Sequence, residues 1–226
     1  MGIFWYLLNP FLTFILMLVI FQDRLGQNIP DYPIYLLLGI IMFNFFQNIT
    51  TESTRIIRER WGIIKSINFP RESLVGSNVL KTLFSHIFEI GVLFLFLLFF
   101  GIPVKNMLIF YPLLLILLSL FTCGISLILS AAAVYFIDLD NIWIFVSRLI
   151  WFATPIFYSI GGQDRLLIFN LFNPMYYFIT IARDFIIYNK FPHIFLIQGI
   201  IFYTLLSMFA GLIIFNKLKK RFAEMV

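Results

Sequence analysis

The sequence has few of the residues that carry out chemistry in enzymes. It contains two histidines and one cysteine, and only 12% of its residues are charged. A membrane-embedded transferase or protease needs clustered histidine, cysteine or carboxylate side chains, and the sequence offers no such cluster. Cys123 lies inside an apolar run, where it can form neither an internal disulfide nor a metal cluster. We therefore expect this chain to have no catalytic residue and to bind neither metal nor cofactor.

The phosphate-binding loop of many nucleotide hydrolases is also missing. The pattern GxxxxGK[ST] occurs nowhere in the chain, so ATP hydrolysis by that route has to take place on another protein. We expect no cleavable signal peptide, because the first apolar run is preceded by no basic segment and is long enough to span a membrane.

What the sequence has in abundance is apolar side chains. Of its 226 residues, 62% are hydrophobic and 19% are aromatic, a composition far from that of a soluble domain. A chain of this length and composition is a polytopic membrane protein with one domain, residues 1–226. The net charge of +5 could suggest a nucleic-acid partner. However, the basic residues lie in loops between apolar runs, which membrane topology explains better.

The hydropathy pattern predicts an all-α membrane protein with six transmembrane helices. Runs of spanning length occur at about 3–21, 33–49, 79–100, 107–134, 142–160 and 194–215. Two further apolar pieces, 166–172 and 175–187, are separated by Asn173-Pro174 and are too short to cross a bilayer. We expect them to form a re-entrant or interfacial helical hairpin.

Lysine and arginine are distributed unequally between the two sides of these six spans. Ten fall on one side, namely Arg55, Arg58, Arg60, Lys65, Arg71, Lys81, Lys217, Lys219, Lys220 and Arg221, and five on the other, namely Arg24, Lys105, Arg165, Arg183 and Lys190. The richer side is expected to be cytoplasmic, which places both termini in the cytoplasm.

The longest polar interruption, Thr51–Glu72, predicts an amphipathic helix between the second and third spans. Its apolar residues recur at helical spacing, whereas its charges lie on the opposite face. Phe69-Pro70 then ends the helix. One interpretation is a helix resting on anionic lipid; the other is a docking element for a cytoplasmic partner. The residues of this candidate surface are Arg55, Arg58, Glu59, Arg60, Trp61 and Lys65.

His86, Glu89 and Arg148 are ionisable residues that lie well inside the predicted spans, away from their ends. Intramembrane ionisable residues are candidates for function, and His86 and Glu89 are one helical turn apart, as a proton site requires. The interpretation we prefer is structural: Glu89 forms an ion pair with Arg148 between the third and fifth helices.

Small and aromatic residues suggest two further roles. Ser119, Thr122, Ser126, Ser130 and Ala133 form a stripe that favours close helix packing. Tyr158, Tyr176 and Tyr177 gather near the predicted outer mouth, where their flat apolar faces with a polar edge suit either sugar rings or an interfacial aromatic belt.

With these residues placed, the chain resembles the permease subunits of type-2 ABC exporters, in the group that exports polysaccharides, O-antigens and teichoic acids. The resemblance is carried by Leu7-Leu8-Asn9-Pro10, by Phe69-Pro70-Arg71-Glu72, by Thr154-Pro155-Ile156-Phe157-Tyr158, and by Asn173-Pro174-Met175 followed by Arg183-Asp184. Two departures are visible. Met1-Gly2 stands where the family has a basic amphipathic segment, and Phe136-Ile137-Asp138 stands where it has a basic residue.

The resemblance implies a homodimer in a bacterial inner membrane, with two copies of a separate cytoplasmic ATPase subunit that binds ATP and Mg²⁺. It implies that Arg55–Ser66 is the coupling helix and that the substrate is a lipid-linked glycan. The outer gate or channel would involve Thr154, Pro155, Tyr158, Asn173, Pro174, Tyr176, Tyr177 and Arg183. The alternatives are a small-molecule or drug exporter of the same superfamily and an integral-membrane enzyme of glycan assembly.

Overall fold

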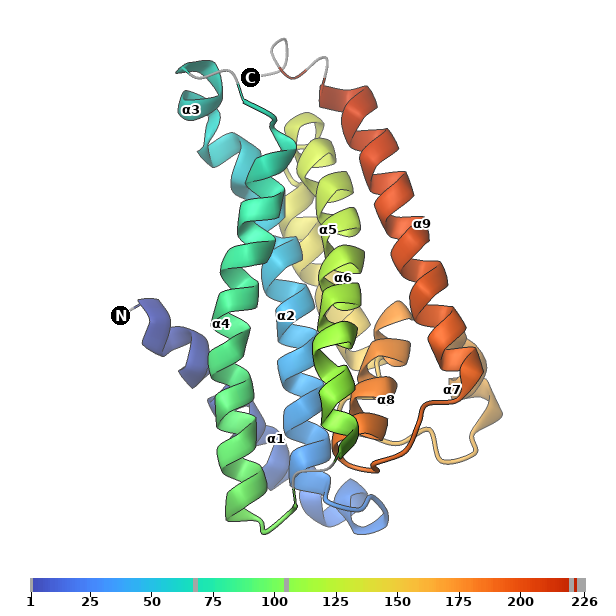
Figure 1. Ribbon diagram of the computed structural model, residues 1–226. Helices are drawn as coiled ribbons and strands as arrows, with labels where there is room; N and C mark the ends of the chain where they lie inside the picture. Colours follow the sequence, from blue (N-terminus) through green and yellow to red (C-terminus); the bar gives the residue numbers. More distant parts are fainter. Residues whose placement is uncertain (1, 67–68, 104–105, 220–221, 223–226) are drawn as a thin grey trace.

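The computed structural model describes residues 2–66, 69–103, 106–219 and 222, and the regular structure in these ranges is entirely helical (Figure 1). The α-helices are α1 (Gly2–Leu25), α2 (Tyr32–Glu59), α3 (Trp61–Ser66), α4 (Glu72–Phe99), α5 (Tyr111–Tyr135), α6 (Leu139–Ala153), α7 (Asp164–Leu171), α8 (Pro174–Ile186) and α9 (Ile194–Leu218). Two 3₁₀ turns, Gly26–Asn28 and Asn106–Phe110, precede α2 and α5. The all-α prediction is confirmed for the described residues.

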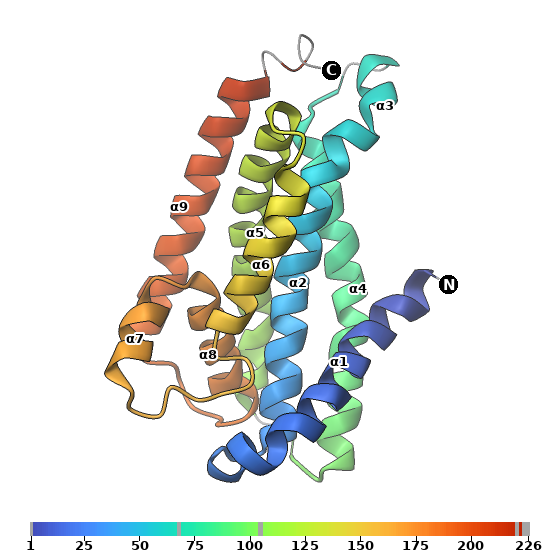
Figure 2. The same cartoon turned by 180° about the vertical axis from the view of Figure 1, so that it is seen from behind.

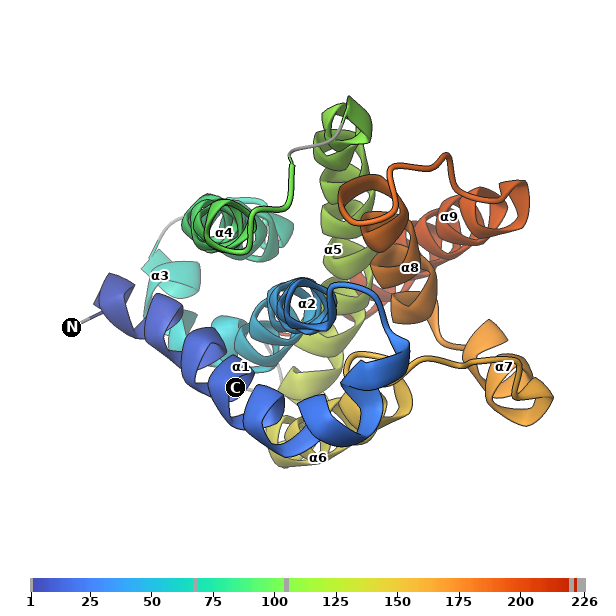
Figure 3. The same cartoon turned by 90° about the horizontal axis from the view of Figure 1, so that it is seen from below.

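The bundle is built around α2. Every side chain from Ile34 to Phe43 is buried, and α2 contacts α1, α4, α5, α6 and α8. Seen along the bundle, α2 lies in the middle of these helices (Figure 3). A helix that is apolar on all faces packs in the interior of a protein, which explains why this segment is central.

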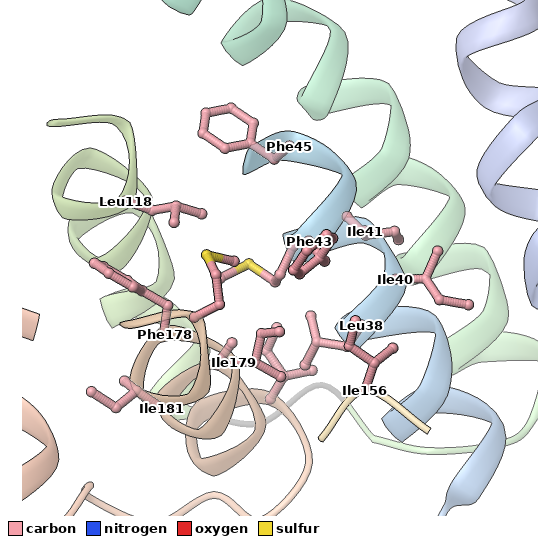
Figure 4. Close-up of a cluster of buried hydrophobic side chains, with 14 of the residues drawn as sticks. Leu38, Ile40, Ile41, Phe43, Phe45, Leu118, Ile156, Phe178, Ile179 and Ile181 are labelled. Atoms are coloured by element: carbon pink, nitrogen blue, oxygen red, sulfur yellow. The ribbon is translucent and has the colours of Figure 1, made fainter. Parts of the chain in front are cut away.

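The largest hydrophobic cluster joins α2 to the helices on either side of it. Leu38, Ile41 and Phe43 of α2 belong to the same cluster as Leu118 of α5 and Phe178 of α8. Figure 4 shows Leu118 and Phe178 on one side of α2 and Ile40 and Ile41 on the other. Contacts across such a cluster lie far apart in the sequence, so the short helix α8 is held by the same core as the long ones.

Four helical segments of the described chain are long and apolar enough to cross a membrane: Tyr32–Glu59, Glu72–Phe99, Asn106–Tyr135 and Ile194–Leu218. The expected span 3–21 coincides with α1, but the side chains of residues 2–7 and 9 lie outside the described part. In Figures 1 and 2, α1 begins beside the middle of α4 and runs to the end of the bundle opposite α3.

The fifth expected span, 142–160, is shorter than predicted. The helix α6 ends at Ala153, because Pro155 excludes Thr154 from helical geometry and gives it an extended backbone with ψ 137°. Residues 154–160 are not helical. With 15 residues, α6 falls short of the roughly 20 that cross a bilayer, so α6 alone is too short to be the predicted span.

The polar stretch after the second span also differs from its prediction. The helix α2 continues through Arg55 to Glu59, and only the short α3 is separate from it. Ile56 and Ile57 are buried in a small cluster with Val75, Leu127 and Phe215. The predicted apolar face therefore packs against the protein's own α4, α5 and α9. Ile67, which also belongs to the predicted apolar face, lies outside the described residues.

The predicted hairpin of two short helices is present. The helices α7 and α8 follow one another around Asn173-Pro174, and both lie in the half of the bundle away from α3 (Figure 1). Pro174 stands at the start of α8, where its missing N–H and fixed φ favour the first helical turn.

The close contact between α5 and α9 is made by two glycines, neither of which belongs to the small-residue stripe predicted on α5. A Cβ at Gly124 would collide with the backbone of Ser207, and one at Gly211 would collide with the backbone of Gly124. The stripe itself, on the face of α5 away from Gly124, is buried at Ser119, Thr122, Ser126, Ser130 and Ala133, as the packing interpretation predicts.

Gly124→Ala should therefore destabilise the bundle by about 1–3 kcal/mol, the usual cost of overpacking. Gly91 of α4 is the matched control, because a Cβ there meets nothing within 4 Å. Thermal unfolding of the detergent-solubilised protein measures both. A Gly124→Ala variant as stable as Gly91→Ala would contradict the close α5–α9 contact.

Candidate functional site

The segment that follows α6 is not helical, so its backbone carbonyls have no partners of the kind that a helix provides. It nevertheless lies inside the helical bundle. Ile156 is fully buried, and Thr154 and Pro155 are buried beside it. At membrane depth, non-helical backbone is tolerated only where protein groups or water satisfy it. The side chains that do so define the first candidate site, the outer cluster, which consists of Tyr32, Tyr35, residues 154–158, Asn173 and Arg183.

Arg183 of α8 supplies donors for two carbonyls of this segment. Its Nη1 donates to Pro155 O at 2.8 Å, and its Nη2 donates to Ile156 O at 2.8 Å and to Tyr35 O at 3.2 Å. The guanidinium also lies over the Tyr35 ring, 3.3 Å from its centroid. Gly39 makes room for it, because a Cβ there would lie 2.9 Å from Arg183 Nη2. One buried side chain thus joins α2, α8 and the segment after α6.

Tyrosine hydroxyls satisfy the remaining carbonyls of the segment. Tyr32 donates to Phe157 O and Tyr35 donates to Tyr158 O, each at 2.9 Å, and Tyr158 donates to Ala153 O at 2.7 Å. Thr154 O accepts from the Ile156 N–H. Every carbonyl from Ala153 to Tyr158 therefore has a donor.

Asn173 connects the start of α8 to the end of α6. Its Nδ2 donates to Thr154 Oγ1 at 2.8 Å, and its Oδ1 accepts from the Met175 N–H as an N-cap. The three sequence motifs around Thr154, Asn173 and Arg183 thus meet in one hydrogen-bonded cluster.

The residues expected at an outer gate divide into two groups by burial. Thr154, Pro155, Asn173, Tyr177 and Arg183 are buried, whereas Tyr158, Pro174 and Tyr176 are half-buried. Tyr177 donates to Leu171 O, and its ring fills the space that Gly199 leaves on α9. The five buried residues contact backbone and side chains of this same chain. We therefore interpret them as residues that hold the α7–α8 hairpin in place.

The rim of the outer cluster carries an ion pair. Asp184 Oδ1 lies 3.2 Å from Lys190 Nζ, with the carboxylate nearly buried and the lysine side chain exposed. Burial raises the pKa of the Asp184 carboxyl above its usual range, and the Lys190 ammonium opposes part of that rise.

The second candidate site, the α3 end, is where the predicted coupling residues lie. Arg55 Nε donates to Asp140 Oδ2 at 3.1 Å, and Arg58 Nη1 donates to Ile137 O at 3.0 Å. These two arginines therefore bind the turn between α5 and α6, in which the chain has no basic residue of its own. Glu59 and Arg60 are exposed and Trp61 is half-buried, whereas the Lys65 side chain lies outside the described residues.

The Phe69-Pro70-Arg71-Glu72 motif joins the start of α4 to the end of α9. Arg71 Nη1 donates to Lys219 O at 2.6 Å, and Lys219 Nζ donates to Glu72 Oε1 at 3.0 Å. Phe69 is half-buried and Pro70 exposed in the connection from α3. Figure 1 shows α3, the start of α4 and the end of α9 at the same end of the bundle.

The preferred ion pair of Glu89 with Arg148 is wrong. Glu89 Oε2 lies 2.9 Å from His86 Nδ1, and His86 Nε2 lies 2.9 Å from the Tyr111 hydroxyl. All three of these side chains are buried between α2, α4 and α5. Arg148 is exposed on α6, on the other side of α2 from α4 (Figure 3). The i, i+3 spacing within one helix gave Glu89 a nearer partner.

Sequence reasoning missed several of these partners. Tyr32 and Tyr35 donate hydrogen bonds in the outer cluster, and Tyr111 bonds His86. Asp140 binds Arg55 of α2. The one available signal was the three-residue spacing of Tyr32 and Tyr35, which places both on one helix face.

Among the described residues, no group of three or more histidine, cysteine or carboxylate side chains could hold a metal ion.

Comparison with known proteins gives matches over most of the chain. The family described as ABC-2 type transporter matches residues 1–187. The O-antigen export system permease protein RfbA of Klebsiella pneumoniae is 29% identical over all of this chain and 88% of its own length. RfbA of Myxococcus xanthus is 24% identical over the same shares, and the polysialic acid transport protein KpsM of Escherichia coli is 22% identical over 96% of this chain and 85% of its own.

Replacing Arg183 should destabilise the protein more than any exposed arginine does. Arg183→Met leaves the buried carbonyls of Pro155 and Ile156 without a donor, and at about 1–3 kcal/mol each the total is at least about 2 kcal/mol. Arg165 of α7 is exposed, so Arg165→Met serves as the control. Thermal unfolding and the yield of monodisperse protein report the difference. Equal stability of the two variants would contradict the assigned role of the guanidinium.

Proposed function

Because the chain belongs to the ABC-2 type transporter family, we propose that it is the channel-forming subunit of an ATP-driven exporter of a lipid-linked polysaccharide. The names of the relatives support the substrate class, since they export O-antigen and transport polysialic acid. The chain would act as a homodimer with two copies of an ABC ATPase, in the inner membrane of a bacterium. Hydrolysis of ATP would take place on the ATPase.

The observation that carries this proposal is the way in which the α3 end is connected to the rest of the bundle. Arg55 and Arg58 bind the α5–α6 turn, and Arg71 and Glu72 bind the end of α9. A partner that moves α3 would therefore move α2, α4, α6 and α9 together. This is the arrangement that a coupling surface needs.

The buried helix α2 then provides a route to the opposite end. It runs from α3 to the outer cluster, where Tyr35 and Gly39 contact Arg183. We infer that displacement of α3 by the ATPase is transmitted along α2 to α8. The α7–α8 hairpin would then gate the exit for the glycan.

The topology that we propose has six crossings, with α3 and both termini in the cytoplasm. The excess of basic residues on the α3 side supports it. The fifth crossing would consist of the short α6 together with the extended segment after it.

Single-cysteine labelling tests this orientation. With Cys123 replaced by serine, Gln163→Cys should react with an impermeant maleimide in intact spheroplasts, since Gln163 is exposed next to α7. Ser66→Cys should react only after lysis. Reaction of Ser66→Cys from outside would invert the proposed topology.

A shape change on α3 tests the docking role. Gly62→Leu adds apolar volume at an exposed position where a Cβ meets nothing within 4 Å, so the chain itself should fold normally. We expect copurification with the ATPase to fall by about tenfold or more, because a docking groove rejects added volume, and surface glycan should fall with it.

Gly76→Leu is the control for this experiment. It makes the same change on α4, at a glycine that is also free of contacts within 4 Å. A lipid-resting helix would tolerate Gly62→Leu or even bind more tightly. Undiminished ATPase binding and export in Gly62→Leu would therefore contradict a coupling role for α3.

A further inference from the structure

Two tyrosine hydroxyls stand apart from all the others that the structure describes. The hydroxyls of Tyr32, Tyr35, Tyr111, Tyr135, Tyr158, Tyr177 and Tyr203 each hydrogen-bond to another group of the protein. Within the described part of the chain, those of Tyr176 and Tyr188 form no such bond. Both line the same cavity. Where the other described hydroxyls all bond groups of the protein, most of them backbone carbonyls, two unused hydroxyls in one cavity indicate a ligand site.

The cavity has a volume of about 200 Å³ and lies between α2, the segment after α6, and α8. The residues that line it include Tyr35, Tyr176, Thr180, Asp184, Tyr188 and Lys190. Pockets for drug-sized ligands measure about 300–1,000 Å³. The cavity is therefore of a size for one ring of a chain rather than for several.

The groups on the wall are those that bind a polyhydroxylated ring. Tyrosine offers an apolar face for ring C–H groups and a hydroxyl that can donate or accept. The Asp184 carboxylate accepts hydrogen bonds from ligand hydroxyls, and Thr180 adds a further hydroxyl. Two cations line the cavity, and both are already engaged: Arg183 donates to the carbonyls of Pro155 and Ile156, and Lys190 is paired with Asp184 at 3.2 Å. A neutral ligand with several hydroxyls fits this balance of charge better than an anion.

The cavity also lies where an exported chain would emerge. Tyr188 and Lys190 belong to the exposed connection between α8 and α9, at the end of the bundle opposite α3 (Figure 1). Asp184 is adjacent to Arg183, which holds α8 to α2. A ligand in the cavity would therefore contact the element that the outer cluster positions.

We propose that this cavity, the α8 pocket, binds one neutral hexose ring of the exported glycan through Tyr176, Tyr188 and Asp184. The inference rests on the proposed function, because it takes the exported glycan as the source of the ring. It adds to that function a monosaccharide site within a single subunit.

Binding of methyl hexosides to the purified permease–ATPase complex in lipid nanodiscs tests the α8 pocket. Methyl α-mannoside, α-glucoside and α-galactoside serve as probes, detected by saturation-transfer NMR. At least one should bind the wild type, and the Tyr176→Phe/Tyr188→Phe double variant should bind it about tenfold more weakly, because two hydrogen bonds are lost while both rings remain.

The matched control is Tyr135→Phe, which removes a hydroxyl at the α3 end, where it bonds Leu218 O. It should leave hexoside binding unchanged. The double variant should keep the thermal stability of the wild type, because neither hydroxyl has a protein partner among the described residues, and this separates a ligand contact from a structural one.

Surface glycan in cells completes the test. A deletion strain should lack it, wild type should restore it, and the double variant should restore it more slowly. No hexoside binding to the wild type, or equal binding to wild type and double variant, would overturn the α8 pocket alone. Full surface glycan in the deletion strain would overturn the proposed function, and with it the exported glycan as the ligand.

Discussion

The structure depends on one constraint: a stretch of backbone that cannot be helical has to be satisfied inside a helical bundle. Pro155 ends α6, and the carbonyls that follow would be left unpaired at a depth where water is scarce. Arg183 and three tyrosines supply the donors. Because those side chains come from α2, α8 and the segment itself, satisfying the carbonyls also fixes how the hairpin sits on the bundle.

The two ends of the molecule are linked by the helix at its centre. At one end, the arginines of α2 bind Asp140 and the carbonyl of Ile137. At the other end, Gly39 and Tyr35 of the same helix receive the guanidinium of Arg183. A continuous helix whose middle is buried on all sides moves as a unit, since close-packed interiors transmit displacement. This gives the proposed coupling between ATPase and outer hairpin a physical path.

Charged residues in this chain are used mainly in contacts with the chain itself. Arg55 and Arg58 were expected to steer a partner, and Arg71 belonged to a motif without an assigned contact, yet each donates to another part of the bundle. Glu89 satisfies His86 within one helix. Among the described side chains of the predicted docking surface, Glu59 and Arg60 stay exposed and are available to a partner. At the opposite end, the unused hydroxyls of Tyr176 and Tyr188 are left for a ligand.

The sequence by itself determined the helical class, the hairpin around Asn173-Pro174 and the close packing of α5, because hydropathy, proline geometry and small-residue spacing act over a few residues. It also indicated which motifs matter, through Thr154-Pro155, Asn173-Pro174 and Arg183. Only the tertiary structure decided that these motifs meet, that Arg148 lies away from Glu89, and that Arg55 binds Asp140. Such pairings depend on which helices become neighbours, and that follows from packing the whole core around α2. Local periodicity carries no information about it.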